Sequence, residues 1–330
     1  MTAAVVFPAL APVRRRELGK FLLVDPLGRR RLAEADDVLG YRLADALADA
    51  EAATATATAA AASDSAAAAA SAAAAEELTD AEQLAFAVAC VALADRAEQE
   101  GLNPAYCVGP SFGERAALAY TGVLPFTDMI RLVSEIARVE REYFAVEHRD
   151  VVTHSFVRVP GQRLTALLAD LGERDEWYEV SGYLDPDFHL VSLRERALAG
   201  FRAAISDVGG YSMHTMRPPA HAAAFAGLRE RMATEVYARF ELTEPRIPVV
   251  SYQTGSLLED PSALRADLLD GLVRPIRWLD TVRSLSELGV TELCVTGPDN
   301  LYHRLRSSRD AFQTTLVDHR RILRRPRPRR

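Results

Sequence analysis

The stretch AYCVGPSFGERAALAY, residues Ala105 to Tyr120, carries the clearest signal of the fold class. Its first four residues predict a short buried strand, and the residues from Glu114 to Tyr120 predict a helix. Between them, GPSFG fits the G-x-S-x-G pattern, in which a sharp turn from strand to helix lifts a serine hydroxyl above the edge of a sheet. Glycine is expected on both sides of Ser111 because larger side chains there would collide. The order strand, glycine turn, helix predicts an α/β fold with a parallel sheet, and it makes Ser111 a candidate nucleophile.

The flanking sequence repeats this alternation of strands and helices. AAVVF, residues Ala3 to Phe7, predicts a buried strand. Helical periodicity and further short apolar runs follow in both directions. They predict helices over 32–47, 80–101, 260–271 and 278–288, and strands over 248–255 and 292–297. These elements predict one large α/β body.

Residues 151–207 differ from this body. Their order of predicted elements is β-α-β-β-α, and a strand near Tyr211 closes it, which resembles a small ferredoxin-like module. We therefore expect an α/β body over 1–150 and 208–318 with a ferredoxin-like small subdomain inserted at 151–207. The Ala-rich run 52–75 carries no apolar side chain larger than Ala, which predicts a surface insertion that is partly helical or disordered.

Composition excludes several classes of protein. The chain has 330 residues, a net charge of −7 and three cysteines without paired spacing, so neither nucleic acid nor a metal or disulfide framework is expected. No apolar run reaches the roughly 20 residues that a membrane span needs, and we expect a cytoplasmic protein. Residues 319–330 predict a basic disordered tail, because Pro326 and Pro328 interrupt its arginines. That tail is either a segment that increases solubility or a binding segment for an acidic partner such as a carrier protein.

The match extends beyond the G-x-S-x-G turn: the stretch VGPSFGERAALAYTGVLPFTDMIRLV, residues 108–133, resembles the motif GHSLGE-x-x-AL-x-x-x-GVL-x-F-x-D-x-x-RLV of the malonyl-CoA:acyl carrier protein transacylases. RRLAEADDVLGYRL, PVVSYQTG, RPIRW and LGVTELCVTGP stand in the order of that family, and the resemblance covers about residues 3–310. It suggests a divergent member from polyketide-type biosynthesis. The resemblance implies an α/β-hydrolase-like large subdomain with a parallel sheet and an inserted ferredoxin-like small subdomain.

The resemblance also implies a reaction. Ser111 would attack an acyl thioester of CoA or of a carrier protein, and the phosphopantetheine thiol of an acyl carrier protein would discharge the acyl-enzyme, with no bound cofactor. His214, in YSMHTMRPP, stands at the position of the family's catalytic histidine. The backbone N–H groups of Phe112 and Leu10 correspond to the oxyanion hole. The backbone of Gly271 corresponds to a position that orients the histidine.

Three departures from the family pattern bear on the substrate. Leu10 replaces a glutamine, Pro110 replaces a histidine before the nucleophile, and Ile136 aligns with the arginine that binds the malonyl carboxylate. An isoleucine cannot form the charge-assisted pair that such an arginine supplies. A substrate carboxylate there would be desolvated without a partner, so we expect an acyl group without a free carboxylate.

The alternatives remain open on sequence alone. The predicted acyl pocket comprises Pro110, Ile136, His189 and Met213. Arg158 or His189 is a candidate replacement charge, which would leave a malonyl-specific transacylase with a relocated carboxylate-binding residue. An editing thioester hydrolase would use the same serine and histidine with water as the acceptor. A catalytically silent homologue that binds the carrier protein is a further alternative.

Overall fold

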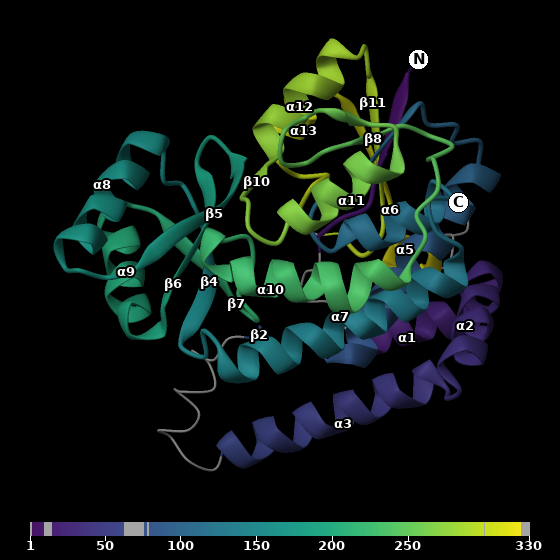
Figure 1. Cartoon of the computed structure of the whole chain (residues 1–330), viewed down its shortest axis with the longest axis horizontal. Helices are drawn as coiled ribbons and strands as arrows, with labels where there is room; N and C mark the ends of the chain where they lie inside the picture. The colour runs from purple at the N-terminus through teal and green to yellow at the C-terminus, as the bar shows by residue number, and fades with distance from the viewer. Residues whose placement is uncertain (1, 10–14, 63–75, 78, 300, 325–330) are drawn as a thin grey trace, which may run out of the picture.

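The computed structural model describes residues 2–9, 15–62, 76–77, 79–299 and 301–324. They form a large body and a small subdomain that lie side by side (Figure 1). This confirms the predicted fold class: an α/β chain with a parallel sheet in a large subdomain and a separate small subdomain.

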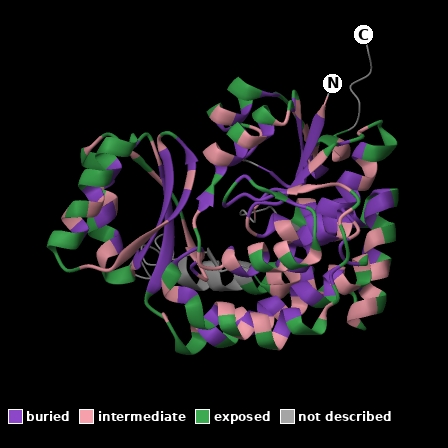
Figure 2. Cartoon of the chain, turned by 45° about the horizontal axis from the view of Figure 1, so that its top comes forward, coloured by how far each residue is buried: buried purple, intermediate pink, exposed green. Residues whose placement is uncertain are grey.

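The sheet of the body has the strand order β12-β11-β1-β3-β8-β9. Its strands are β1 (Ala3–Val6), β3 (Tyr106–Val108), β8 (Val249–Val250), β9 (Leu257–Leu258), β11 (Glu292–Thr296) and β12 (Gln313–Val317). All neighbouring pairs are parallel except β8 and β9. Strand β1 is central and fully buried, as expected for a parallel strand covered by helices on both faces (Figure 2).

The helices of the body surround this sheet. They are α1 (Arg15–Val24), α2 (Pro26–Leu39), α3 (Leu43–Ala62), α5 (Asp80–Gln99), α6 (Gly113–Tyr120), α7 (Phe126–Val146), α10 (Ala226–Arg231), α11 (Pro261–Asp270), α12 (Trp278–Glu287), α13 (Arg306–Ala311) and α14 (His319–Leu323), with short 3₁₀ or π turns at Ala223–Phe225, Met232–Val236 and Tyr237–Arg239. Helix α5 is buried on all sides from Glu82 to Ala94 and forms the centre of the core beneath the elbow. Thr79 and Glu82 cap its start reciprocally.

The small subdomain has the order β-α-β-β-α-β of a ferredoxin-like module. Its elements are β4 (Val151–Val157), α8 (Gly161–Glu173), β5 (Tyr178–Asp185), β6 (Phe188–Arg194), α9 (Glu195–Asp207) and β7 (Tyr211–Arg217). The antiparallel strands run β5-β6-β4-β7, and short segments from the body, β10 (Ile276–Arg277) and β2 (Glu76–Glu77), extend the sheet at its two edges. Helices α8 and α9 cover its outer face (Figure 1).

Several predicted boundaries differ from the observed elements. Strand β7 belongs to the small sheet although it lies beyond residue 207, because it pairs with β4. The expected disordered tail begins too early: residues 319–323 form α14, where His319 is buried. Helix α3 runs into the Ala-rich insertion as far as residue 62, whereas residues 63–75 and 325–330 lie outside the described residues. Among the described helices, none has the length and hydropathy that crossing a bilayer requires.

Candidate active site

The turn between β3 and α6 holds Ser111 in a left-handed conformation with φ of 54°. A positive φ is strained for a residue with a side chain and is typical of functional positions. A Cβ atom at Gly109 would lie 2.6 Å from the backbone nitrogen of Glu114, and one at Gly113 would lie 2.0 Å from the carbonyl oxygen of Phe7. The expected steric need for both glycines is therefore confirmed, and GPSFG forms a nucleophile elbow.

The hydroxyl of Ser111 is hydrogen-bonded to His221. Ser111 Oγ lies 2.7 Å from His221 Nε2, and His221 Nδ1 lies 2.6 Å from the carbonyl oxygen of Gly271. Because a carbonyl oxygen only accepts, Nδ1 carries the proton and Nε2 is left to accept from the serine hydroxyl. This arrangement prepares a neutral imidazole to remove the Ser111 proton.

The small subdomain fixes the segment that carries His221. The neighbouring residue, Ala220, donates its N–H to Thr153 Oγ1 at 3.0 Å, and its carbonyl accepts from Ser192 Oγ at 3.3 Å. Thr153 and Ser192 are fully buried, and their hydroxyls are 2.7 Å apart. After the histidine, the carboxylate of Glu179 accepts from the first backbone N–H groups of the next helical turn. The imidazole is therefore held from both sides, with φ of 61° at His221.

The pKa of His221 is lowered to about 4, mainly by burial and in smaller part by the positive charge of Arg115, against the opposing effect of hydrogen bonds to the backbone of Gly271 and Arg274. A pKa this far below the ordinary value near 6.5 keeps the ring neutral at physiological pH. The histidine is therefore ready to act as a base before substrate arrives.

The prediction that His214 is the base is wrong in this structure. His214 lies on strand β7 with an exposed side chain, and its backbone N–H and carbonyl both pair with the hydroxyl of Ser155. The chain turns through Pro218 and Pro219 after the strand and brings His221 to the nucleophile. The sequence signal that was missed is this second histidine, seven residues later, directly after the residues that end the strand.

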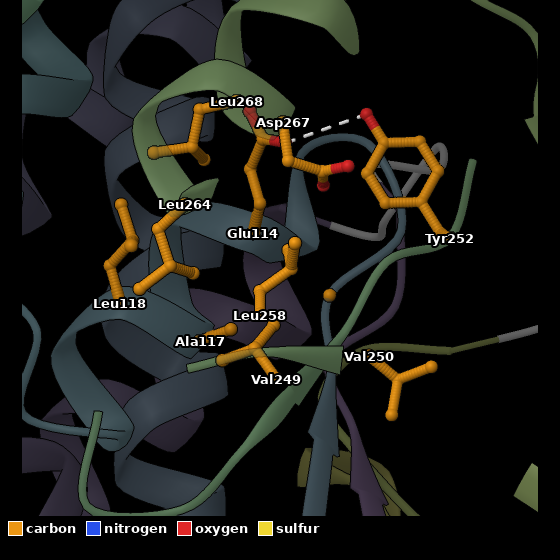
Figure 3. Close-up of a pocket in the computed structure, with 11 residues that line it drawn as sticks. Glu114, Ala117, Leu118, Val249, Val250, Tyr252, Leu258, Leu264, Asp267 and Leu268 are labelled. Carbon is orange, nitrogen blue, oxygen red and sulfur yellow. Dashed lines mark hydrogen bonds between the residues drawn. The ribbon is translucent and has the colours of Figure 1, made fainter. Parts of the chain in front are cut away.

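A buried tyrosine packs behind the imidazole. The Tyr252 ring meets the His221 ring edge to face, with centroids 6.1 Å apart. Its hydroxyl donates to Glu114 Oε2 at 3.4 Å, the dashed line in Figure 3. Burial raises the pKa of Glu114 to about 8. A Cβ atom at Gly271 would lie 2.2 Å from the Tyr252 hydroxyl, so the glycine leaves room for the tyrosine that supports the histidine.

A cavity of about 400 Å³ opens at Ser111 between the two subdomains. The body contributes polar groups to its wall, among them Arg115, Glu140 and Tyr252. The small subdomain contributes mainly apolar side chains from β5, β6 and β7: Leu184, Phe188, Leu190, Met213 and Met216. The nucleophile thus lies at the boundary of an apolar chamber large enough for an acyl chain.

The other predicted site residues have different positions. Met213 lines the cavity, whereas Pro110, Ile136 and His189 are not among its lining residues. Ile136 is 2% exposed on the buried face of α7, in an apolar core of the body, and His189 Nε2 lies 2.9 Å from the Val159 carbonyl inside the small sheet. The pocket prediction is corrected for these three residues because each packs into the interior of its own subdomain.

The predicted oxyanion hole is only partly described. The residue after the nucleophile, Phe112, is the N-cap of α6 and lines the cavity, whereas Leu10 lies outside the described residues. In the described part of the chain, no group of three or more His, Cys, Asp and Glu side chains is arranged to hold a metal ion.

The fold is that of the acyl-carrier-protein malonyltransferases. A malonyl-transacylase solved in complex with the type II PKS acyl-carrier protein AntF superimposes with a TM-score of 0.77 over 96% of both chains at 22% identity. The transferase from Burkholderia pseudomallei 1710b gives the same TM-score over 96% of both chains at 20% identity.

Sequence comparison points to the same family at low identity. The chain is 28% identical over 205 residues to the malonyl CoA-acyl carrier protein transacylase of Salmonella typhimurium, covering 61% of this chain and 64% of the relative. It is 28% identical over 231 residues to that of Escherichia coli K12, covering 68% and 73%. Residues 155–216 match the VinK acyltransferase small domain. The predicted resemblance to the malonyl-CoA:acyl carrier protein transacylase family is therefore confirmed.

Proposed function

We propose that the chain is an acyltransferase that moves an acyl group without a free carboxylate from a CoA or carrier-protein thioester to an acyl carrier protein in polyketide biosynthesis. The observation that carries the proposal is the Ser111 Oγ to His221 Nε2 distance of 2.7 Å at a strained elbow. The similarity to malonyl transacylases, one of them solved with a type II PKS acyl-carrier protein, supports the carrier protein as partner.

The first half of the reaction forms an acyl-enzyme. His221 Nε2 takes the Ser111 proton as Oγ bonds to the thioester carbonyl carbon, and the backbone N–H of Phe112 donates to the developing oxyanion. When the C–S bond breaks, the imidazolium returns the proton to the leaving sulfur. The Gly271 carbonyl stabilises the imidazolium by accepting from Nδ1.

The second half transfers the acyl group to the carrier. The phosphopantetheine thiol gives its proton to His221 and attacks the Ser111 ester carbonyl, and the C–O bond breaks as Ser111 regains its proton. Dividing the transfer into two steps allows one thiol to leave before the other enters, so both substrates use the same cavity.

The charges at the cavity support an acyl group without a carboxylate. Two arginines line it, and both already face carboxylates: Arg115 lies 3.4 Å from Glu140, and Arg217 lies 2.5 Å from Glu195. Much of the remaining wall is apolar. An anionic acyl group would lose its hydration without gaining an unpaired cation.

The test follows the masses of the enzyme and of a carrier protein during incubation with malonyl, acetyl, propionyl and longer acyl thioesters. The proposal predicts an adduct on Ser111 with uncharged acyl groups, its transfer to the carrier, and no adduct on S111A. Preferred malonyl loading would contradict the substrate class. Release of free acid without carrier acylation would indicate a hydrolase, and the absence of every adduct would indicate a silent homologue.

A further inference from the structure

We propose that Glu140 determines the acyl selectivity of the cavity by occupying Arg115, which would otherwise bind a substrate carboxylate. The inference rests on the proposed acyl-enzyme at Ser111. It assigns the discrimination against anionic acyl groups to a residue of α7 that faces the cavity.

Arg115 is the buried cation nearest in sequence to the nucleophile. It follows Ser111 by four residues, lines the same cavity and is 7% exposed. Its guanidinium carbon lies 4.1 Å from the centroid of the Phe112 ring, which fixes the plane of the group. Its positive charge also contributes to the lowered pKa of His221, of which burial is the main cause. Among the described residues, its Nε has no hydrogen-bond partner.

Glu140 approaches this arginine from the neighbouring helix. Its carboxylate lies 3.4 Å from Arg115 Nη2, and its side chain is 15% exposed. On α7, Glu140 stands four residues after Ile136, so the two positions share a face of the helix. The chain therefore carries an acid one turn beyond the position that aligns with the family's carboxylate-binding arginine.

The balance of charge explains the selectivity. Glu114 and Glu140 line this wall of the cavity together with Arg115. Burial raises the pKa of Glu114 to about 8, so the carboxylate that faces Arg115 is that of Glu140. A malonyl carboxylate would compete with Glu140 for Arg115 in a site that removes its water. Removal of the negative charge at residue 140 leaves the guanidinium available for a charge-assisted pair with the substrate.

The test compares Ser111 acylation by malonyl-CoA and by acetyl-CoA in E140Q. Glutamine keeps a hydrogen-bond acceptor for Arg115 and removes the charge. The malonyl to acetyl rate ratio should rise about tenfold, the effect of one hydrogen bond to a charged group. E142Q is the matched control, because Glu142 lies on the exposed face of the same helix and pairs with Arg138 at 2.8 Å. The malonyl to acetyl rate ratio of E142Q should equal that of the wild type. In R115Q/E140Q the increase in this ratio seen in E140Q should disappear.

An unchanged ratio in folded E140Q, or a gain that persists in R115Q/E140Q, would overturn the inference. No acylation of the wild type by any thioester would instead refute the proposed function. Melting curves establish whether E140Q folds.

If E140Q does not fold, the wild type supplies the same test through pH. Burial raises the pKa of Glu140 above that of an ordinary glutamate, so acidification should protonate it and raise the malonyl to acetyl ratio. The groups facing Glu140 are Arg115, Glu114, Asp80 and Tyr237. Ionisation of His221 affects both substrates and cancels in the ratio. A ratio that stays flat or falls with acidification would overturn the inference.

Discussion

Substitution of Gly271 by alanine should disturb the base without touching the nucleophile. The new Cβ atom would lie 2.2 Å from the Tyr252 hydroxyl, whereas ordinary contacts begin near 3.4 Å, so one group must move by about 1 Å. Gly271 also supplies the carbonyl that accepts from His221 Nδ1. A displacement of this size in a catalytic arrangement costs about 100-fold in rate. We therefore expect G271A to acylate Ser111 about 100-fold more slowly than the wild type.

The matched variant for G271A is G271A/Y252F. Loss of the hydroxyl removes the 2.2 Å contact and leaves the ring carbon Cζ at 3.3 Å, which a small shift accommodates. The assay is the initial rate of CoA release from acetyl-CoA, with the Ser111 adduct followed by mass spectrometry. The double variant should recover most of the lost rate, and Y252F alone should show the cost of losing the hydroxyl. A wild-type rate in G271A, or a double variant no faster than G271A, would refute the reasoning.

Two further predictions concern the ionisation and the support of the base. The value of kcat/KM for acyl-enzyme formation should stay level from pH 8 to about pH 5 and fall by half near pH 4. The reason is that the pKa of His221 is lowered to about 4, mainly by burial, and only the neutral ring accepts a proton. A midpoint near 6.5 in the pH–rate profile would contradict this. T153V should lower kcat about tenfold with little change in KM, because the Ala220 N–H beside the histidine loses its acceptor. S192A should change kcat in the same direction. An effect of these variants on thermal stability alone would contradict a positioning role.

Most of the elbow could be predicted because its turn lies within sixteen consecutive residues. The need for a glycine at position 109 follows from the local turn, where a Cβ atom would meet the backbone of Glu114. At position 113 the Cβ atom would meet the carbonyl of Phe7, which is distant in sequence, although the G-x-S-x-G pattern marks both positions. The division into a parallel α/β body and a ferredoxin-like module followed in the same way from the order of strands and helices.

The partner of the nucleophile depended on structure that is not local. His214 lies on the last strand of the small subdomain and His221 follows that strand. The choice between them rests on the turn after β7 and on anchors from β4 and β6. The charge pair at the cavity joins α6 to α7 and likewise has no sequence pattern of its own. Ile136 could be recognised as a departure from the family, but its burial on the inner face of α7 could not.

The most direct test of the catalytic pair compares H221A with H214A. Removal of the base should slow acylation of Ser111 by about 10² to 10⁴-fold, the usual contribution of general base catalysis. H214A removes an exposed side chain at the rim of the same cavity and should cost less than about tenfold. Acylation rates of Ser111, measured for both variants with one uncharged acyl thioester, show which histidine is the base. If H214A abolishes the Ser111 adduct while H221A retains it, the assignment of His221 is wrong.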